Sequence, residues 1–362
     1  MREAFALGVT LLLGCGTQTA PPSGLDGSPA DTTVADAPGE VSPDTSLDIP
    51  PDTASDTITA PEVQGDGAPQ DGPGPRGWAS ARALPMPRQE VAVLAARGRV
   101  WVFGGFESGR IVANVRAYDP ARDQWEEGPS LPLALHHTAV AAVGEDLYVL
   151  GGMTGLDFRP FAECWVLRAG AMEWAPIAPM PAPRGAAGAG FVGGRVVVAG
   201  GVTTGGRVAA VTMLYDPRAN TWREGAPLPT AREHLAVAVN GGALWTFGGR
   251  LLSLTTNLPT VEVYDPAMDR WRSAPPLPTP RGGLCAAFLG DTAVVIGGEE
   301  PARALTTVEG LDLPAGPWRA LPALPVPRHG HGCAALGGRL YLVGGADRPI
   351  FAPVTAVDVY TP

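Results

Sequence analysis

The chain of 362 residues contains no lysine, so arginine supplies all 26 of its basic side chains. Domains that bind nucleic acid carry a basic stripe or patch. Here 24 arginines are spread along residues 77–362 and are balanced by 24 acidic side chains. We therefore expect no nucleic-acid partner. The net charge of −10 comes from residues 17–76, which hold eleven acids and one arginine.

The chain also lacks an uncharged apolar run long enough to cross a bilayer as a helix. Its N-terminal apolar stretch, Ala4–Leu13, follows Arg2 and is typical of a secretory signal peptide. The stretch ends in Leu12-Leu13-Gly14-Cys15, which resembles a bacterial lipobox. This resemblance implies a lipoprotein-type signal peptide over residues 1–15, lipidation of Cys15, and contact with a membrane only through that anchor.

The next segment lacks the side chains that build a core. Residues 17–76 contain no tryptophan, tyrosine or phenylalanine and are rich in Pro, Asp, Thr, Ser and Gly, a composition typical of disorder. We predict a disordered acidic tether over residues 16–76, and favour a solvated spacer over an acidic binding tail. With the lipobox, this predicts an extracytoplasmic protein anchored to a bacterial membrane. Gly16 favours the outer membrane or cell surface over the inner membrane.

The rest of the chain repeats every 47 to 49 residues. Each copy has an almost continuously apolar run, such as Arg99–Phe103, which indicates a strand buried on both faces. A glycine pair follows each run: Gly104-Gly105, Gly151-Gly152, Gly200-Gly201, Gly248-Gly249, Gly297-Gly298 and Gly344-Gly345. This period, with paired glycines after an apolar strand, is typical of a propeller blade.

A tryptophan gives each copy a second landmark: Trp78, Trp125, Trp174, Trp222, Trp271 and Trp318. In all six copies the glycine pair begins 26 residues after the tryptophan, whereas 21 to 23 residues separate the pair from the next tryptophan. The fixed interval indicates strands joined by tight turns. The variable interval indicates a surface loop.

The order of glycine pair, Tyr-Asp-Pro (Tyr215-Asp216-Pro217), tryptophan and Leu-Pro-x-Pro-Arg (Leu84–Arg88) resembles the kelch repeat over residues 77–362. The resemblance implies an all-β, six-bladed kelch-type β-propeller with four antiparallel strands per blade. The second copy departs from the pattern with Leu135 in place of the arginine, and the fifth has Leu311-Asp312-Leu313 in place of Tyr-Asp-Pro.

The sixth copy ends at Tyr360-Thr361-Pro362 without a tryptophan strand, and residues 77–85, around Trp78, contain such a strand. We predict that these N-terminal and C-terminal strands pair, which closes the ring and removes an open edge.

Three cysteines fall within the repeats: Cys164, Cys285 and Cys333. Their number is odd and they lack metal-site spacing, so a disulfide framework is not expected. Cys285 and Cys333 lie four and five residues after the arginine of their copies, and this offset of one residue should turn them to opposite strand faces. We predict buried free thiols.

A binding site is expected at the mouth of the central channel. In a four-stranded meander, the loop that leads into the first strand lies at the same end as the loop between the second and third strands. The positions two residues after the repeat arginine should therefore ring the mouth: Glu90, His137, Ala186, His234, Gly283 and Gly330. Their mixed character favours one asymmetric ligand over a symmetric partner. The variable loops add further candidates for ligand binding: Phe106, Arg110, Phe158, Arg159, Arg250 and Glu299.

The repeat arginines, Arg88, Arg184, Arg232, Arg281 and Arg328, form either a cationic collar or structural ties to the carbonyls or acids of adjacent blades. We favour the structural role because they recur in phase. His329 and His331 share a strand face, but no acid or cysteine nearby in sequence completes a metal site. We expect neither a metal nor a cofactor.

The sequence thus predicts a monomeric, membrane-tethered binding module for a protein, peptide or glycan. No Ser-His-Asp spacing, phosphate loop or paired carboxylates indicate catalysis, and the Tyr-Cys pattern of kelch-like copper radical oxidases does not match. Six-bladed kelch proteins include periplasmic sialate mutarotases. An enzyme that isomerises a small sugar at the same face is therefore the alternative.

Overall fold

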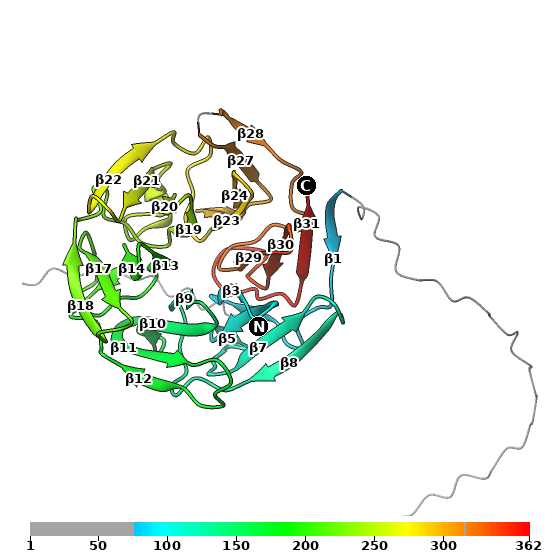
Figure 1. Cartoon of the computed structure of the whole chain (residues 1–362). Coiled ribbons are helices and arrows are strands. Elements are labelled where there is room, and N and C mark those ends of the chain that lie inside the picture. The colour runs from blue at the N-terminus through cyan, green and yellow to red at the C-terminus, as the bar shows by residue number, and fades with distance from the viewer. Residues whose placement is uncertain (1–75, 315) are drawn as a thin grey trace, which may run out of the picture. The chain divides into compact units, whose positions relative to one another are not determined.

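The structure, a computed structural model, describes residues 76–314 and 316–362. The predicted signal peptide, Cys15 and the predicted tether up to residue 75 lie outside the described residues. In the described part, six four-stranded antiparallel sheets stand around a central channel as the blades of a propeller (Figure 1). The predicted all-β, six-bladed architecture is therefore confirmed. No helix in this part is long and apolar enough to cross a membrane.

Each blade is a meander of four strands that runs outward from the channel. The innermost strands are β3 (Ala92–Ala96), β9 (Ala139–Val143), β13 (Gly188–Val192), β19 (Ala236–Asn240), β23 (Cys285–Leu289) and β29 (Gly332–Leu336). The second strands are β4 (Arg99–Phe103), β10 (Asp146–Thr154), β14 (Arg195–Ala199), β20 (Ala243–Phe247), β24 (Thr292–Ile296) and β30 (Arg339–Val343).

The third strands are β7 (Val115–Asp119), β11 (Arg159–Leu167), β17 (Thr212–Asp216), β21 (Val261–Asp265), β27 (Val308–Asp312) and β31 (Val357–Thr361). The outer strands are β8 (Gln124–Gly128), β12 (Ala175–Ile177), β18 (Thr221–Gly225), β22 (Arg270–Ala274), β28 (Trp318–Ala320) and β1 (Gly77–Ser80).

Short elements occupy the loops at one end of the blades. They are β2 (Arg88–Gln89), β5 (Phe106–Glu107), β6 (Arg110–Ile111), β15 (Val202–Thr203), β16 (Arg207–Val208), β25 (Glu299–Glu300), β26 (Arg303–Ala304) and the 3₁₀-helix η1 (Leu254–Thr256). All but β2 lie in the variable loops that follow the glycine pairs, and in the second blade the same loop is an extension of the β10–β11 hairpin. These loops are therefore ordered hairpins or turns that stand beside the channel mouth.

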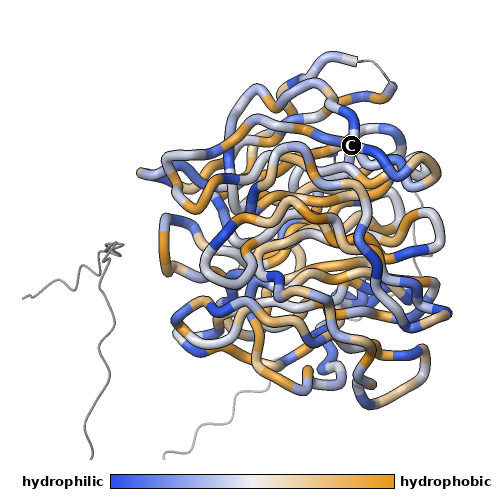
Figure 2. The backbone as a smooth tube through the Cα atoms, turned by 90° about the vertical axis from the view of Figure 1, so that its left-hand side faces the viewer, coloured by the Kyte–Doolittle hydropathy of each residue, from blue (hydrophilic) through white to orange (hydrophobic). Residues whose placement is uncertain are grey.

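The core consists of apolar layers between neighbouring blades. In β4, β14, β20, β24 and β30 the first residue is partly or fully exposed and the next four are buried, as expected for strands covered on both faces. Apolar residues accordingly run along the strands, and hydrophilic residues gather at turns and loops (Figure 2). Burial of this surface is the main favourable term for the fold.

The N-terminal strand closes the ring as predicted. β1 pairs with β31 in antiparallel register, with Trp78 opposite Tyr360. The indole Nε1 of Trp78 also donates a hydrogen bond of 2.7 Å to the carbonyl of Pro322, on the neighbouring fifth copy. The tryptophans of the other five copies donate in the same way to a carbonyl that follows the outer strand of the preceding blade. Each blade is thereby tied to its neighbour.

The prediction of free thiols at Cys285 and Cys333 is wrong, because these residues form a disulfide across 48 residues of sequence. The two cysteines do lie on opposite faces in terms of the repeat. However, neighbouring blades pack through opposite faces. The fifth blade contacts the sixth with one face, and the sixth contacts the fifth with its other face. The offset of one residue therefore brings the two sulfurs together. Cys164 is buried and free, as predicted.

Removing the closing strand should destabilise the whole propeller. Deletion of residues 77–85 exposes the edge of β31 and removes the Trp78 contacts, so we expect a clearly lower midpoint of thermal unfolding. Circular dichroism of the full chain and of the deletion variant provides the measurement. Deletion of residues 57–65, an equally long segment of the predicted tether, is the control. Equal unfolding midpoints for all three proteins would contradict this role of β1.

Candidate functional site

Backbone hydrogen bonds link the six predicted mouth positions into a closed ring. The N–H of each residue donates to the carbonyl of the equivalent residue in the preceding blade, with N···O distances from 2.6 to 3.4 Å. All six have a left-handed backbone, with φ between 52° and 64°. We call this set the channel ring: Glu90, His137, Ala186, His234, Gly283 and Gly330. The predicted position of these residues around the channel is confirmed.

The channel ring holds four non-glycine residues in a conformation that costs an L-residue roughly 1–2 kcal/mol. Glycine, which avoids this cost, occupies the ring only in the fifth and sixth blades. The hydrogen bonds from both neighbours fix the backbone of each position. The direction of every ring side chain is therefore set by the propeller itself, and strain of this kind is typical of functional sites.

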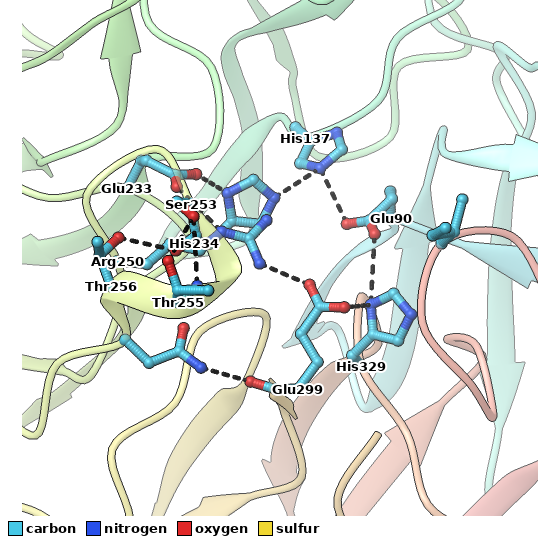
Figure 3. Close-up of polar contacts among 12 residues, drawn as sticks. Glu90, His137, Glu233, His234, Arg250, Ser253, Thr255, Thr256, Glu299 and His329 are labelled. Carbon is cyan, nitrogen blue, oxygen red and sulfur yellow. Dashed lines mark hydrogen bonds and ion pairs between the residues drawn. The ribbon is translucent and has the colours of Figure 1, made fainter. Parts of the chain in front are cut away.

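Three ring side chains meet above the channel (Figure 3). The Nε2 atom of His137 lies 3.0 Å from Oε2 of Glu90 and 3.0 Å from Nε2 of His234. These residues belong to the first, second and fourth blades. The structure thus brings together, from distant parts of the sequence, the three mouth residues that were predicted as ligand-binding.

A second layer of charged side chains joins the ends of this trio. Nδ1 of His234 contacts a carboxylate oxygen of Glu233, and Arg250 lies 3.0 Å from the other oxygen of Glu233 and 2.6 Å from Glu299. Nδ1 of His329 lies 3.3 Å from Glu299 and 3.8 Å from Glu90. The contacts close on themselves, and we call the whole set the polar circuit: Glu90, His137, His234, Glu233, Arg250, Glu299 and His329 (Figure 3).

Pairing between two repeat positions builds this second layer. The residue after the repeat arginine forms a β-bridge with the residue after the glycine pair, as in Glu233 with Arg250 and Gly282 with Glu299. The glycine pairs permit the close approach: a Cβ on Gly248 would lie 2.5 Å from the carbonyl oxygen of Arg281. Arg250 and Glu299 are thereby carried from the variable loops to the channel mouth.

Burial and mutual charge shift the pKa values of the circuit. Burial raises the pKa of Glu90, but the attraction and hydrogen bond of His137, and the charges of His329 and His234, outweigh it and hold that pKa well below its usual range. Burial, with the Arg250 charge and His137, holds the pKa of His234 well below its ordinary value. Burial also lowers the pKa of His136 to about 4, with a contribution from His137. The trio therefore combines a carboxylate with at least one histidine, His234, whose charged form is disfavoured.

An aromatic rim adjoins the polar circuit. Phe158 is 40% exposed and its ring centroid lies 5.7 Å from that of His137. Phe351 is 51% exposed and packs edge-on against Phe106, with the centroids 5.2 Å apart. Phe106, expected as an exposed loop residue, is buried at 1% exposure and supports the rim from below. We call Phe158 and Phe351 the aromatic rim.

The two remaining loop candidates are not joined to this site. Arg159 is largely exposed and pairs with Asp157 at 2.7 Å, and Arg110 is an exposed residue of β6. Among the described residues, no hydrogen bond or ion pair links either arginine to the polar circuit. Their predicted binding role stays a prediction.

The repeat arginines are structural, as favoured. Arg88, Arg232, Arg281 and Arg328 are completely buried, and Arg184 nearly so. Arg232 pairs with Glu262 at 2.5 Å and Arg281 with Glu309 at 2.7 Å, and both acids lie on the third strand of the same blade. The expectation that these arginines tie adjacent blades together is therefore wrong. Each one braces its own blade behind the mouth.

The cavity below the channel ring is small, with a volume of about 100 Å³. Pockets for small organic molecules usually measure about 300–1,000 Å³, so this space suits an ion, a few waters or the tip of one side chain. A cavity of about 300 Å³ lies elsewhere, between the fifth and sixth blades, beside Leu289, Arg319 and Tyr360. It lacks the converging polar groups of the mouth.

Comparisons with known proteins agree with this architecture. A family model described as the KLHDC2/KLHL20/DRC7 kelch-repeats domain matches residues 127–298, and the kelch motif matches residues 87–132. The chain is a kelch-repeat protein. Its predicted resemblance to the kelch repeat is thereby confirmed.

Curated relatives match about half of this kelch-repeat chain. Kelch-like protein 41b of Danio rerio is 27% identical over 174 residues, which cover 48% of this chain and 28% of the relative. Kelch-like protein 40 of Mus musculus is 30% identical over 175 residues, with the same coverage of both chains. Beta-scruin of Limulus polyphemus is 28% identical over 205 residues, 51% of this chain and 21% of the relative. The chain thus spans less than a third of each relative.

A solved structure titled "Structure of YjhT" matches with a TM-score of 0.66 at 16% identity. The match covers 77% of this chain and 96% of the other. At this identity the likeness supports the propeller fold alone.

Sequence reasoning missed Phe351 of the aromatic rim and did not assign His329 to the polar circuit. It also missed Glu233 and His136. Both directly follow the repeat position occupied by arginine or, in the second copy, by Leu135. The signal available in the sequence was that this position pairs with the residue after the glycine pair. Reading the two positions together would have placed Glu233 beside Arg250 and indicated the second layer.

Burial of His331 should make folding sensitive to acid. Burial, together with the nearby charge of Arg328, lowers the pKa of His331 to about 3. The unfolded chain, with an ordinary histidine pKa near 6.5, takes up the proton first, so stability falls as the pH drops from about 6.5 towards 3. The slope for one such group is at most about 1.4 kcal/mol per pH unit.

His331→Gln should lose less stability over the same pH range. Glutamine can still donate to the Ile296 carbonyl, which lies 3.2 Å from Nε2 of His331, but it binds no proton. Urea unfolding between pH 7 and pH 4.5 measures the difference. Parallel pH curves for the two proteins would contradict the assignment.

Proposed function

We propose that the propeller is a binding module that holds a protein or peptide at the channel mouth, and that a lipid anchor tethers it outside the cytoplasm. One observation carries the binding proposal: the polar circuit and the aromatic rim lie side by side. A peptide offers both an apolar side chain for the rim and polar groups for the circuit. Kelch propellers are typically protein-interaction modules, which agrees with this proposal.

The size of the channel cavity favours surface binding over a buried sugar site. About 100 Å³ is too little to enclose a monosaccharide, and Phe158 and Phe351 offer apolar surface outside the cavity. A glycan stacked on the rim stays an alternative ligand of the same face. The alternative of a sugar-isomerising enzyme has no comparable support from the geometry.

The extracytoplasmic proposal rests on two features. Leu12-Leu13-Gly14-Cys15 resembles a lipobox, and the Cys285–Cys333 disulfide is of a kind that persists in oxidising compartments. The acidic segment after Cys15 would serve as a spacer. Its length suits a tether, since a flexible coil of sixty residues spans roughly 40–45 Å.

Removing the mouth side chains should abolish peptide binding. Random peptides displayed on phage and selected on the immobilised full chain supply the ligands. We expect the triple variant Glu90→Ala, His137→Ala, His234→Ala and the single variant Phe158→Ala each to weaken the selected peptides at least tenfold, as measured by calorimetry. Both variants keep their Cβ atoms, so the propeller should stay folded.

The matched control carries Glu145→Ala and Asp291→Ala, two exposed residues in turns at the opposite end of the blades. This control should bind as the unchanged chain does. Equal peptide affinity in all variants would contradict the mouth as the binding site. Accelerated interconversion of sugar anomers by the unchanged chain would favour the enzyme instead.

Lipidation of Cys15 should determine where the protein resides. In bacterial cells supplied with labelled palmitate, we expect the full chain to carry label and to sediment with membranes. Cys15→Ser should lose the label and leave the membrane fraction. Cys164→Ser, which alters a buried thiol, is the control and should retain both. Label and sedimentation that persist in Cys15→Ser would contradict the anchor.

A further inference from the structure

The trio of Glu90, His137 and His234 has the composition of a transition-metal site. Each residue contributes one potential ligand atom, and the three atoms lie within 4.8 Å of one another. Two histidines with one carboxylate can hold a divalent metal and leave coordination positions open. This inference does not depend on the proposed peptide binding.

The hydrogen bonds behind the trio assign the ring nitrogens of His137. Nε2 of His136 lies 3.1 Å from the carbonyl oxygen of Gly155 and so carries a proton, because a carbonyl only accepts. A neutral His136 then accepts at Nδ1, which lies 2.5 Å from Nδ1 of His137. His137 must donate from that nitrogen. In neutral His137, Nε2 then has a lone pair and faces Glu90 and His234, whereas in protonated His137 it donates to Glu90.

The same reasoning applies to His234. The carboxylate of Glu233 contacts its Nδ1, which places an acceptor beside that nitrogen. With the proton on Nδ1, Nε2 of a neutral His234 carries a lone pair and lies 3.0 Å from Nε2 of His137. When both histidines are neutral, three electron-rich atoms converge, and either a proton on His137 or a metal ion balances them.

The outer contacts have the form of a second coordination layer. Metal-bound histidines usually donate their other ring nitrogen to a carboxylate or another acceptor, which fixes the ring. Glu233 fills this role for His234, and His136 for His137. In addition, Glu90, Glu233 and Glu299 outweigh the single positive charge of Arg250. Counted over its three carboxylates and its one arginine, the polar circuit has a formal charge of −2, which a divalent cation would balance.

The distances also suit one ion. Donors about 2.0–2.2 Å from a tetrahedral zinc ion lie roughly 3.3–3.5 Å apart. The two measured pairs are 3.0 Å apart, so slight side-chain rotation accommodates the ion. The ring backbone, fixed by hydrogen bonds on both sides, need not move.

We propose that Glu90, His137 and His234 bind one divalent cation of the zinc class at the channel mouth. Its open position faces the mouth, where a carboxylate or carbonyl oxygen of a ligand can reach it. Glu233 and His136 position the two histidine ligands.

Cobalt(II) provides the test, because nitrogen-ligated four-coordinate Co²⁺ absorbs in the visible. The full chain, freed of metal by dialysis against EDTA, is titrated with Co²⁺, and Zn²⁺ is then added. We expect visible bands that saturate at one ion per chain and disappear with Zn²⁺. Elemental analysis after equilibrium dialysis with Zn²⁺ gives an independent stoichiometry.

Four variants make the assignment specific. Glu90→Gln and His137→Gln should lose the stoichiometric site, and Glu233→Gln should bind about 10–100-fold more weakly. His331→Gln is the matched control, since its Nε2 faces the Ile296 carbonyl and not the trio, and it should bind normally. Circular dichroism in EDTA verifies the fold of each variant.

Two results would overturn the proposal. One is the absence of stoichiometric Co²⁺ and Zn²⁺ binding by the unchanged chain. Misfolding of a variant cannot explain this result, because no substitution is involved. The other is equal binding by Glu90→Gln and His137→Gln, which would show that the metal occupies another part of the chain.

Discussion

Six hydrogen bonds between equivalent backbone groups encircle the channel, and the geometry of the mouth depends on them. Each bond joins one blade to the next, so the ring links the spacing and the rotation of neighbouring blades. The left-handed backbone lets a residue offer its N–H to one neighbour and its carbonyl to the other. It also sends the side chains of Glu90, His137 and His234 from three separate blades to one point.

Two other interactions support the ring from outside. The repeat arginines fill the space behind it, and four of the five pair with acids of their own blades, as Arg232 does with Glu262. Breaking such a buried pair by removing one partner typically costs about 3–5 kcal/mol. At the perimeter, each repeat tryptophan bonds to a carbonyl that follows the preceding blade's outer strand, as Trp78 does with Pro322. The arginines thus stabilise each blade internally. Hydrogen bonds join neighbouring blades both at the channel and at the perimeter of the propeller.

The sequence was sufficient to place the repeating blades and the ring around the channel. The glycine pairs and tryptophans revealed the blades, and the register from the arginine correctly placed Glu90, His137 and His234 on one ring. The sequence was insufficient where two periodic positions from different segments meet. The Glu233–Arg250 bridge depends on strand register beyond the glycine pair, and Phe106 is buried only because Phe351 and His136 pack on it.

The error at Cys285 and Cys333 has a geometric cause of the same kind. Side-chain alternation within a strand correctly assigned them to opposite faces. Alternation within a strand does not describe how two blades pack. Neighbouring blades contact each other through opposite faces. On the innermost strands, side chains one residue out of phase in adjacent blades are therefore candidates for contact, as Cys285 and Cys333 show.

Strain gives the last reason to regard the mouth as a site. A propeller built for stability alone would gain from glycine at all six ring positions, because glycine adopts positive φ without steric cost. Two blades have it, and Ala186 packs its Cβ against Met153 and Val202. At Glu90, His137 and His234 the left-handed backbone is strained, and polar side chains are in addition held close together and away from water. The fold itself does not require a carboxylate and two imidazoles to meet there, and this is why we propose a ligand at the mouth.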